Sequence, residues 1–253
     1  METGQLGFVQ QFVDIAKRTF TLPILKQHMM DAVKEIGFAH FSMTHHVDLQ
    51  ATGAANNVAL TNYPDDFVEN YLTTRMYRSD PVVAASCHTA TGFKWSEMGR
   101  LIRFRKDQLR IFELSRRTGL GEGYAVPVHL PGEANGACVF ATQAGHDIPA
   151  QNEFMAQLIG RYAFDAARMI IRRRDHLPKP GGEPKLTTRQ IDCVLLVAKG
   201  HSNHEIAEKL SIRTTTVTDY LDEARRRYNA RNRTQLAMRA VFDGTFSLSD
   251  ALS

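Results

Sequence analysis

The residues best suited to chemistry stand near the C-terminus, in segment 213–233. Basic side chains there could neutralise phosphates, and short polar side chains on one side of a helix could reach base edges. The candidates for base contacts are Thr215, Thr218, Asp219 and Asp222. The candidates for phosphate contacts are Arg225, Arg226, Arg227 and Arg233, and Thr187 upstream is a further candidate for a DNA contact. Phosphate contacts would position the protein on DNA without reading its sequence.

Two short helices must position these side chains. The spacing predicts one helix over residues 203–210, a tight corner at 211–212 and a second helix over 213–228. Ala207 supplies the small residue that a close helix crossing needs. Apolar side chains recur at the spacing of a packed interface: Ile206, Leu210, Ile212, Val217 and Leu221. With Thr214 or Thr215 as the cap of the second helix, the pattern predicts a helix-turn-helix whose second helix lies in the DNA major groove.

Two further helices, over 188–199 and 234–242, would complete an all-α, four-helix domain over residues 185–253. The charge distribution agrees with this position. Residues 1–167 carry 15 Lys and Arg against 17 Asp and Glu, whereas 168–184 and 185–253 each have a net charge of +3. A polyanion would be attracted to the C-terminal third. A solvated basic surface would show the same charge, so the prediction depends on the helix pattern as well.

Other reactive side chains do not form a recognisable catalytic or metal site. His45 and His46 are neighbours on a predicted strand and would point to opposite faces. The pair His201 and His204 has no further ligands nearby. Cys87 beside His88 has no evident orienting carboxylate, and no phosphate-binding glycine loop is present. The sequence therefore predicts a protein that is not an enzyme and that holds neither a metal nor a cofactor.

A segment rich in Pro and Gly, residues 177–184, predicts a linker between two domains. Residues 1–176 alternate helical patterns with strand-like runs. We therefore expect an α+β domain, an α/β/α sandwich around an antiparallel sheet. The helical patterns cover 8–17, 23–36, 107–118 and 151–174, and the strand patterns cover 40–46, 57–61, 123–130 and 137–142. A turn-rich loop, 131–136, joins the last two strands as a hairpin.

The remaining features predict a cytoplasmic protein without a membrane partner. No apolar run approaches the roughly 20 residues that a membrane-spanning helix needs. The N-terminal residues lack the pattern of a signal peptide. The three cysteines, Cys87, Cys138 and Cys193, are far apart and give no sign of a disulfide framework.

The C-terminal domain resembles the LuxR-type DNA-binding domain. The resemblance covers about residues 186–242, on the segments 186–190, 199–207, 215–217 and 232–235. It implies that the third of four helices reads the major groove and that the fourth helps to pair subunits. Four positions depart from the usual residues: Gln190 for Glu, Val194 for Leu, Ser211 for Gly and Thr218 for a basic residue. Acidic side chains on the predicted DNA side, Asp219 and Asp222, further indicate that the family's operators do not transfer to this chain.

The N-terminal domain resembles the autoinducer-binding domain of quorum-sensing LuxR-type regulators over most of residues 15–175. The similar segments are 63–71, 80–83, 93–95, 119–120 and 123–128. The ligand implied by the resemblance is an N-acyl homoserine lactone. Asp80 would accept its amide hydrogen, the Trp95 indole would donate to the lactone carbonyl, and the Tyr71 hydroxyl would donate to the acyl carbonyl. The remaining candidates for ligand contacts are Tyr63, Phe67, Val83 and Thr142.

Each of these side chains also has a purely structural interpretation. Asp80 precedes Pro81 and could cap a helix, and Trp95 and Tyr71 could belong to the core. Phe67 stands where the family usually has Trp, which shrinks the pocket wall. This departure favours an alternative, a regulator that acts without a ligand or with a signal other than a lactone. A third hypothesis is an N-terminal domain that works mainly in protein interaction or catalysis.

One recognition helix makes few base contacts, so specific binding predicts a homodimer on a near-palindromic DNA site. The expected dimer contacts are the helices over 151–174 and 234–242. The expected partners are double-stranded DNA, a small-molecule autoinducer and a second copy of the chain, and RNA polymerase is a further candidate.

Overall fold

The computed structural model describes residues 2–48, 57–131, 133–174 and 186–253. The chain divides into two compact units, and the N-terminal one takes in all of the first 177 residues except 130–133. The predicted linker, 177–184, lies outside the described residues. Within them, no helix is both long and apolar enough to cross a membrane.

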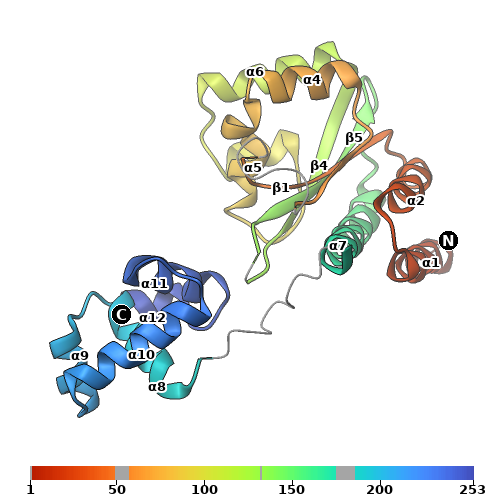
Figure 1. Cartoon of the computed structure of the whole chain (residues 1–253). Helices are drawn as coiled ribbons and strands as arrows, with labels where there is room; N and C mark the ends of the chain where they lie inside the picture. Colours follow the sequence, from red (N-terminus) through yellow and green to blue (C-terminus); the bar gives the residue numbers. More distant parts are fainter. Residues whose placement is uncertain (1, 49–56, 132, 175–185) are drawn as a thin grey trace. The chain divides into compact units, whose positions relative to one another are not determined.

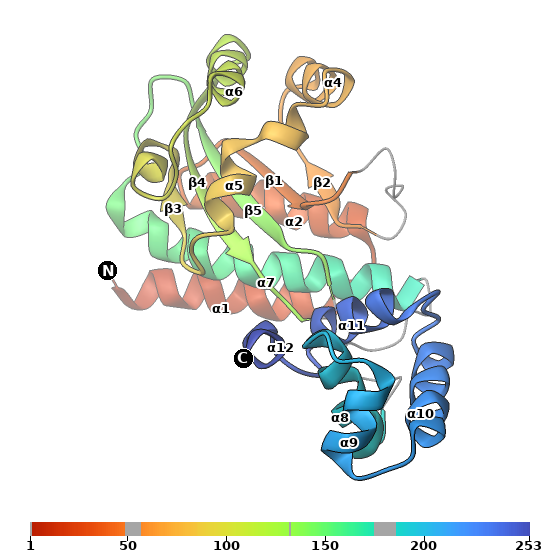
Figure 2. The ribbon, with the colours of Figure 1, turned by 90° about the vertical axis from the view of Figure 1, so that its left-hand side faces the viewer.

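The N-terminal unit is built on a five-stranded sheet in the order β2-β1-β5-β4-β3, and every neighbouring pair is antiparallel (Figure 2). The strands are β1 (His40–His45), β2 (Ala59–Thr61), β3 (Phe93–Lys94), β4 (Leu120–Val128) and β5 (Gly136–Gln143). β4 and β5 form the predicted hairpin. The two-residue β3 was not predicted, because so short a strand leaves no alternating pattern in the sequence.

Helices cover both faces of this sheet, which confirms the predicted α/β/α sandwich (Figure 1). One face carries α1 (Glu2–Arg18), α2 (Leu22–Glu35) and α7 (Ala150–Arg174). The other face carries α4 (Asp65–Thr73), α5 (Pro81–Ser86) and α6 (Lys106–Arg117), with the short 3-10 helices η1 (Met76–Ser79) and η2 (Trp95–Arg100). The sequence pattern had indicated α1, α2, α6 and α7, with α1 starting six residues later than it does.

The main core lies between α7 and the sheet. Phe140 and Phe164 are fully buried there, and His45 packs edge-on against Phe164 at 5.1 Å between ring centroids. Gly160 lets α7 approach the sheet closely, because a Cβ at this position would lie only 3.0 Å from the Phe140 ring. The opposite face of the sheet is packed less completely, and it is there that the cavity described below lies.

The C-terminal unit is all-helical. It contains α8 (Thr188–Ala198), α9 (Asn203–Leu210), α10 (Thr214–Arg227), α11 (Arg233–Phe242) and α12 (Leu248–Leu252). The four predicted helices are present, and the five-residue α12 adds to them. Ala207, Ile206, Val217 and Leu221 are buried in one core, as the helix-turn-helix pattern predicted.

The N-terminal caps of α10 and α8 bear on two points of the sequence analysis. The prediction that Thr214 or Thr215 caps α10 is wrong, because both residues already lie within the helix. Arg213 stands at the N-cap, and its side chain makes no capping hydrogen bond. Gln190 replaces the usual Glu without loss of a capping box. Its amide oxygen accepts from the Thr187 N–H at 3.0 Å, and the Thr187 hydroxyl accepts from the Gln190 N–H.

Candidate functional site

A cavity of about 300 Å³ lies on the face of the sheet that α4, α5 and α6 cover. Most of its lining is apolar, and a few polar side chains project into it, which is the usual composition of a small-molecule site. Six of the seven predicted ligand-contact residues line it: Tyr63, Phe67, Tyr71, Asp80, Val83 and Trp95. The structure therefore brings together residues that are spread over more than thirty positions of the sequence.

Asp80 has two roles in this wall. One carboxylate oxygen accepts from the Val82 N–H at 2.7 Å and caps α5, and the other accepts from the Tyr71 hydroxyl at 2.5 Å. Burial raises the pKa of the Asp80 carboxyl above its ordinary value of 3.8, while the bonds from Tyr71 and the backbone oppose the rise. The carboxylate keeps lone pairs for one more donor, because each oxygen can accept twice.

Three aromatic side chains of the α4 region form one side of the cavity. Tyr63 meets Phe67 edge-on at 5.3 Å, and Phe67 stacks on Tyr71 at 5.5 Å. A phenol has one hydrogen, and that of Tyr71 is donated to Asp80. The Tyr63 hydroxyl is buried without a partner among the described residues, and burial raises its pKa well above 10. Tyr63 is thus the phenol with a free donor.

Trp95 lies across β4 at the end of the cavity nearest β3. Gly123 makes this possible, because a Cβ there would stand 2.1 Å from the indole. The ring also meets Phe112 at 6.5 Å. The buried indole N–H has no hydrogen-bond partner within the described part of the chain. A buried donor without an acceptor costs about 1–3 kcal/mol, so this atom is a natural place for a ligand acceptor.

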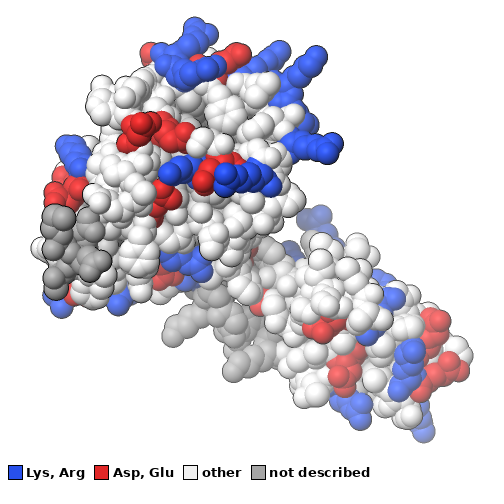
Figure 3. All heavy atoms as spheres, turned by 180° about the vertical axis from the view of Figure 1, so that it is seen from behind, with Lys and Arg blue, Asp and Glu red and all other residues white. Residues whose placement is uncertain are grey.

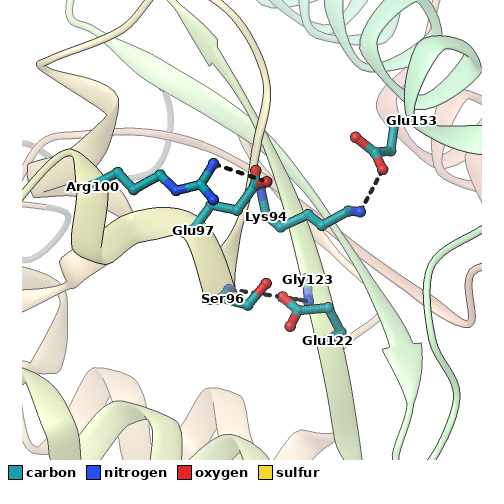
Figure 4. A network of polar contacts seen from close by, with 7 residues as sticks. All are labelled: Lys94, Ser96, Glu97, Arg100, Glu122, Gly123 and Glu153. Carbon is teal, nitrogen blue, oxygen red and sulfur yellow. Dashed lines mark hydrogen bonds and ion pairs between the residues drawn. The ribbon is translucent and has the colours of Figure 1, made fainter. Parts of the chain in front are cut away.

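A network of carboxylates holds the segment that carries Trp95 (Figure 4). The Glu122 side chain accepts from the Ser96 N–H at 3.2 Å and from the Gly123 N–H at 3.0 Å. Lys94 pairs with Glu153 of α7 at 2.6 Å. Both residues that flank Trp95 are therefore tied down, which fixes the position of the indole over Gly123.

Thr142, the seventh predicted contact, lies outside this cavity. Side chains alternate across a strand, and in β5 Ala137 and Val139 line the cavity. Cys138 and Phe140 face α7, where they lie near Gly160. Thr142 is two residues beyond Phe140 and therefore lies on the same face of β5. Its hydroxyl donates to the Glu122 and His146 carbonyls at 3.2 and 2.7 Å. The structure thus gives Thr142 a role in joining the β4 and β5 ends.

β1 and the residue that follows it contribute polar lining side chains that the sequence reasoning missed: Ser42, Thr44 and His46. The signal was present, because these even-numbered positions alternate with the buried Phe41, Met43 and His45. The predicted opposite orientation of His45 and His46 is confirmed, since His45 contacts Phe164 and His46 lines the cavity. Within the described residues, no group of three metal-ligating side chains is present.

The second unit carries the predicted DNA contacts on the outside of α10. Thr215, Thr218, Asp219, Asp222 and Arg226 are exposed and follow one another at helical spacing. Thr218 is additionally tied to α9, because its hydroxyl accepts from the Asn203 side chain at 3.2 Å. Lys, Arg, Asp and Glu are intermixed on the face of this unit that Figure 3 shows.

Three of the predicted phosphate contacts, Arg225, Arg227 and Arg233, are engaged within the unit. The Arg227 guanidinium donates to the Glu223 carboxylate of the same helix at 2.5 Å. The Arg225 guanidinium donates to Asp222 at 3.0 Å and to the Arg231 carbonyl at 2.9 Å. The Arg233 guanidinium donates to the His201 carbonyl at 2.5 Å. The Arg226 side chain has no such bond to any described residue, so it is the arginine of this group most available to a phosphate.

Family models match both units. The model "Autoinducer binding domain" matches residues 24–167, and "Bacterial regulatory proteins, luxR family" matches residues 184–240. The chain is 26% identical over 190 residues to the transcriptional activator protein AhyR of Aeromonas hydrophila, a match that covers 74% of this chain and 72% of AhyR. It is also 26% identical over 242 residues to the quorum sensing-dependent transcriptional regulator RpaR of Rhodopseudomonas palustris, covering 94% of each chain.

The fold agrees with these matches. The crystal structure of Escherichia coli SdiA superposes with a TM-score of 0.67 at 21% identity, over 94% of this chain and 98% of that chain. The chain therefore belongs to the LuxR family of bacterial regulatory proteins, and it is a LuxR-type transcriptional regulator that combines an autoinducer-binding domain with a helix-turn-helix domain.

Proposed function

We propose that the cavity of the N-terminal unit binds an N-acyl homoserine lactone and that this ligand controls DNA binding by a homodimer. The observation that carries the proposal is the buried, unpartnered indole N–H of Trp95 in the same cavity as the Asp80 carboxylate. A lactone offers a carbonyl to the first and an amide hydrogen to the second.

In this arrangement Trp95 donates to the lactone carbonyl and Asp80 accepts the amide hydrogen. Tyr63 donates to the acyl carbonyl, because the hydrogen of Tyr71 is already given to Asp80. Tyr71 then acts by orienting the carboxylate. Phe67 and Val83 supply apolar surface to the ligand.

A second candidate is a signal without a lactone ring. Phe67 favours it, because this cavity residue stands where the family usually has Trp and its smaller ring shrinks the pocket wall. SdiA, whose fold this chain shares, has been solved with octanoyl-rac-glycerol, an acyl compound without that ring. Acyl glycerols therefore form the second arm of any binding test.

Dimerisation is proposed through α7 and α11. Both helices expose large apolar side chains: Tyr162 (41%) and Met169 (37%) on α7, and Met238 (65%) and Phe242 (52%) on α11. Two copies of α10 would then read the two halves of a near-palindromic site. A mass of one subunit at micromolar concentration, both with and without ligand, would contradict this part of the proposal.

The deciding experiment is thermal unfolding against a panel of acyl homoserine lactones and acyl glycerols. A ligand at a hundredfold excess over its dissociation constant adds about 2.7 kcal/mol, which raises the midpoint by several degrees. Asp80→Asn should remove the shift, whereas Asp66→Asn, an exposed carboxylate on α4, should keep it. A shift with glycerols alone would favour the second candidate, and no shift with either class would contradict both.

A further inference from the structure

The cavity has a polar group at each end. Trp95 lies on Gly123, which pairs with Ala141 at one end of the β4–β5 ladder. His46 directly follows His45, which pairs with Gly136 at the opposite end of β5. Five strand positions separate Ala141 from Gly136, which corresponds to about 16 Å at the rise of a β-strand. The strands that carry these positions, β1, β5 and β4, run side by side in Figure 2.

The end marked by His46 is built for a hydrogen bond. His46 lines the cavity, and its Nδ1 atom is buried without a hydrogen-bond partner in the described ranges of the chain. Burial, with smaller contributions from His129 and His45, lowers the pKa of His46 to about 4. The imidazole is therefore neutral at physiological pH, and its free nitrogen can accept or donate according to the tautomer.

The cavity wall between the two ends carries both polar and apolar side chains. Ser42 and Thr44 of β1 lie on the same strand face as His46, while Ala137, Val139 and Ile111 supply apolar surface. A ligand whose polar head meets Asp80 and Trp95 would extend its tail along this wall toward His46. A plain alkyl end would leave the buried imidazole nitrogen without a partner.

We propose that the signal recognised by this protein is an acyl compound whose tail carries an oxygen-bearing, hydrogen-bonding group at its far end, and that His46 is the residue that selects for it. This inference rests on the proposed function, because it places the head of the ligand at Asp80 and Trp95. It goes further by assigning a second recognition point and a class of tail.

The test compares matched pairs of acyl homoserine lactones, from hexanoyl to dodecanoyl, each with a terminal methyl and with a terminal hydroxyl. Dissociation constants are measured by titration calorimetry on the full-length protein. At the best chain length the wild-type protein should prefer the hydroxyl compound by about tenfold, which is the upper range of one net hydrogen bond. His46→Phe should abolish or reverse that preference, and His46→Gln, which keeps an amide donor and acceptor, should retain part of it.

The outcomes separate the two proposals. If the methyl compounds bind as well as the hydroxyl compounds, or if His46→Phe changes both equally, the far-end inference is wrong while the lactone function stands. If no lactone binds, the proposed function fails and the inference fails with it. Should His46→Phe not fold, the wild-type preference and its behaviour in His46→Gln still decide the matter.

Discussion

The Tyr71 hydroxyl donates to the Asp80 carboxylate at 2.5 Å inside the cavity wall, so each side chain satisfies the other. Tyr71→Phe removes the donor and leaves a buried carboxylate oxygen short of a partner. We expect a loss of about 1–3 kcal/mol in the free energy of unfolding, measured by urea denaturation. Tyr220→Phe, on α10, is the matched control and should change stability little, because the Tyr220 hydroxyl makes no hydrogen bond to a described residue. An unchanged midpoint for Tyr71→Phe would show that the bond contributes nothing.

His46 predicts a dependence of stability on acid. Its pKa falls from 6.5 to about 4 in the folded protein, chiefly through burial. Between these values the unfolded chain binds a proton that the folded protein does not, so stability is lost as pH falls from 6.5 toward 4. The expected slope is at most about 1.4 kcal/mol per pH unit. His46→Gln should flatten the curve, and His88→Gln, at an exposed histidine, should leave it as it is.

Gly123 predicts an effect on ligand response through Trp95. In Gly123→Ala the new Cβ would overlap the indole, which must then leave β4. We expect lactone affinity to fall by more than about tenfold, because the displaced indole loses its hydrogen bond to the ligand. Because the chain has a single tryptophan, its emission spectrum reports the displacement directly. Gly7→Ala, where a Cβ meets nothing, is the control; a wild-type spectrum and affinity in Gly123→Ala would contradict the prediction.

We expect replacement of Ser211 by glycine to stabilise the protein. It ends α9 with φ 56°, in the left-handed region where the family usually has Gly. Ser211→Gly should raise the free energy of unfolding by about 0.5–1 kcal/mol, because the left-handed conformation costs a residue with a Cβ. Asn229, at φ 47°, should gain less from the same change, since asparagine tolerates this region better. Calorimetric midpoints of the two variants give the comparison, and a lower midpoint for Ser211→Gly would refute it.

We expect substitution of two arginines of α10 to have different effects, one on DNA binding and the other on stability. Arg226 is exposed, so Arg226→Ala should weaken DNA binding without changing stability and reduce the salt slope by about 1. Arg225 bonds to Asp222 and to the Arg231 carbonyl, so Arg225→Ala should lower the unfolding midpoint of the protein. Fluorescence anisotropy with labelled DNA at several salt concentrations measures the first effect. An equal loss of stability in both variants would contradict the distinction.

The sequence predicted most of the fold because long periodic segments carry their own signal. The helix pair at Ala207 and the hairpin of β4 and β5 follow from spacing alone. Short elements without a repeat, such as β3 and α12, were missed. In the cavity, the resemblance located Asp80 and Trp95 on the wall, whereas Thr142 was assigned without knowledge of its strand face. That the Tyr71 hydrogen is donated to Asp80 depends on a contact between α4 and the N-cap residue of α5, which no local sequence pattern encodes.

β5 presents alternate residues to the α7 core and to the cavity, and this limits how the pocket can change over generations. A point substitution at Val139 would reshape the cavity and leave the buried face of the strand alone. An insertion or deletion of one residue within β5 would exchange the two faces, placing Phe140 toward the ligand and Val139 toward α7. Signal specificity can therefore diversify in this strand by substitution of single residues, but not by insertion or deletion of one residue.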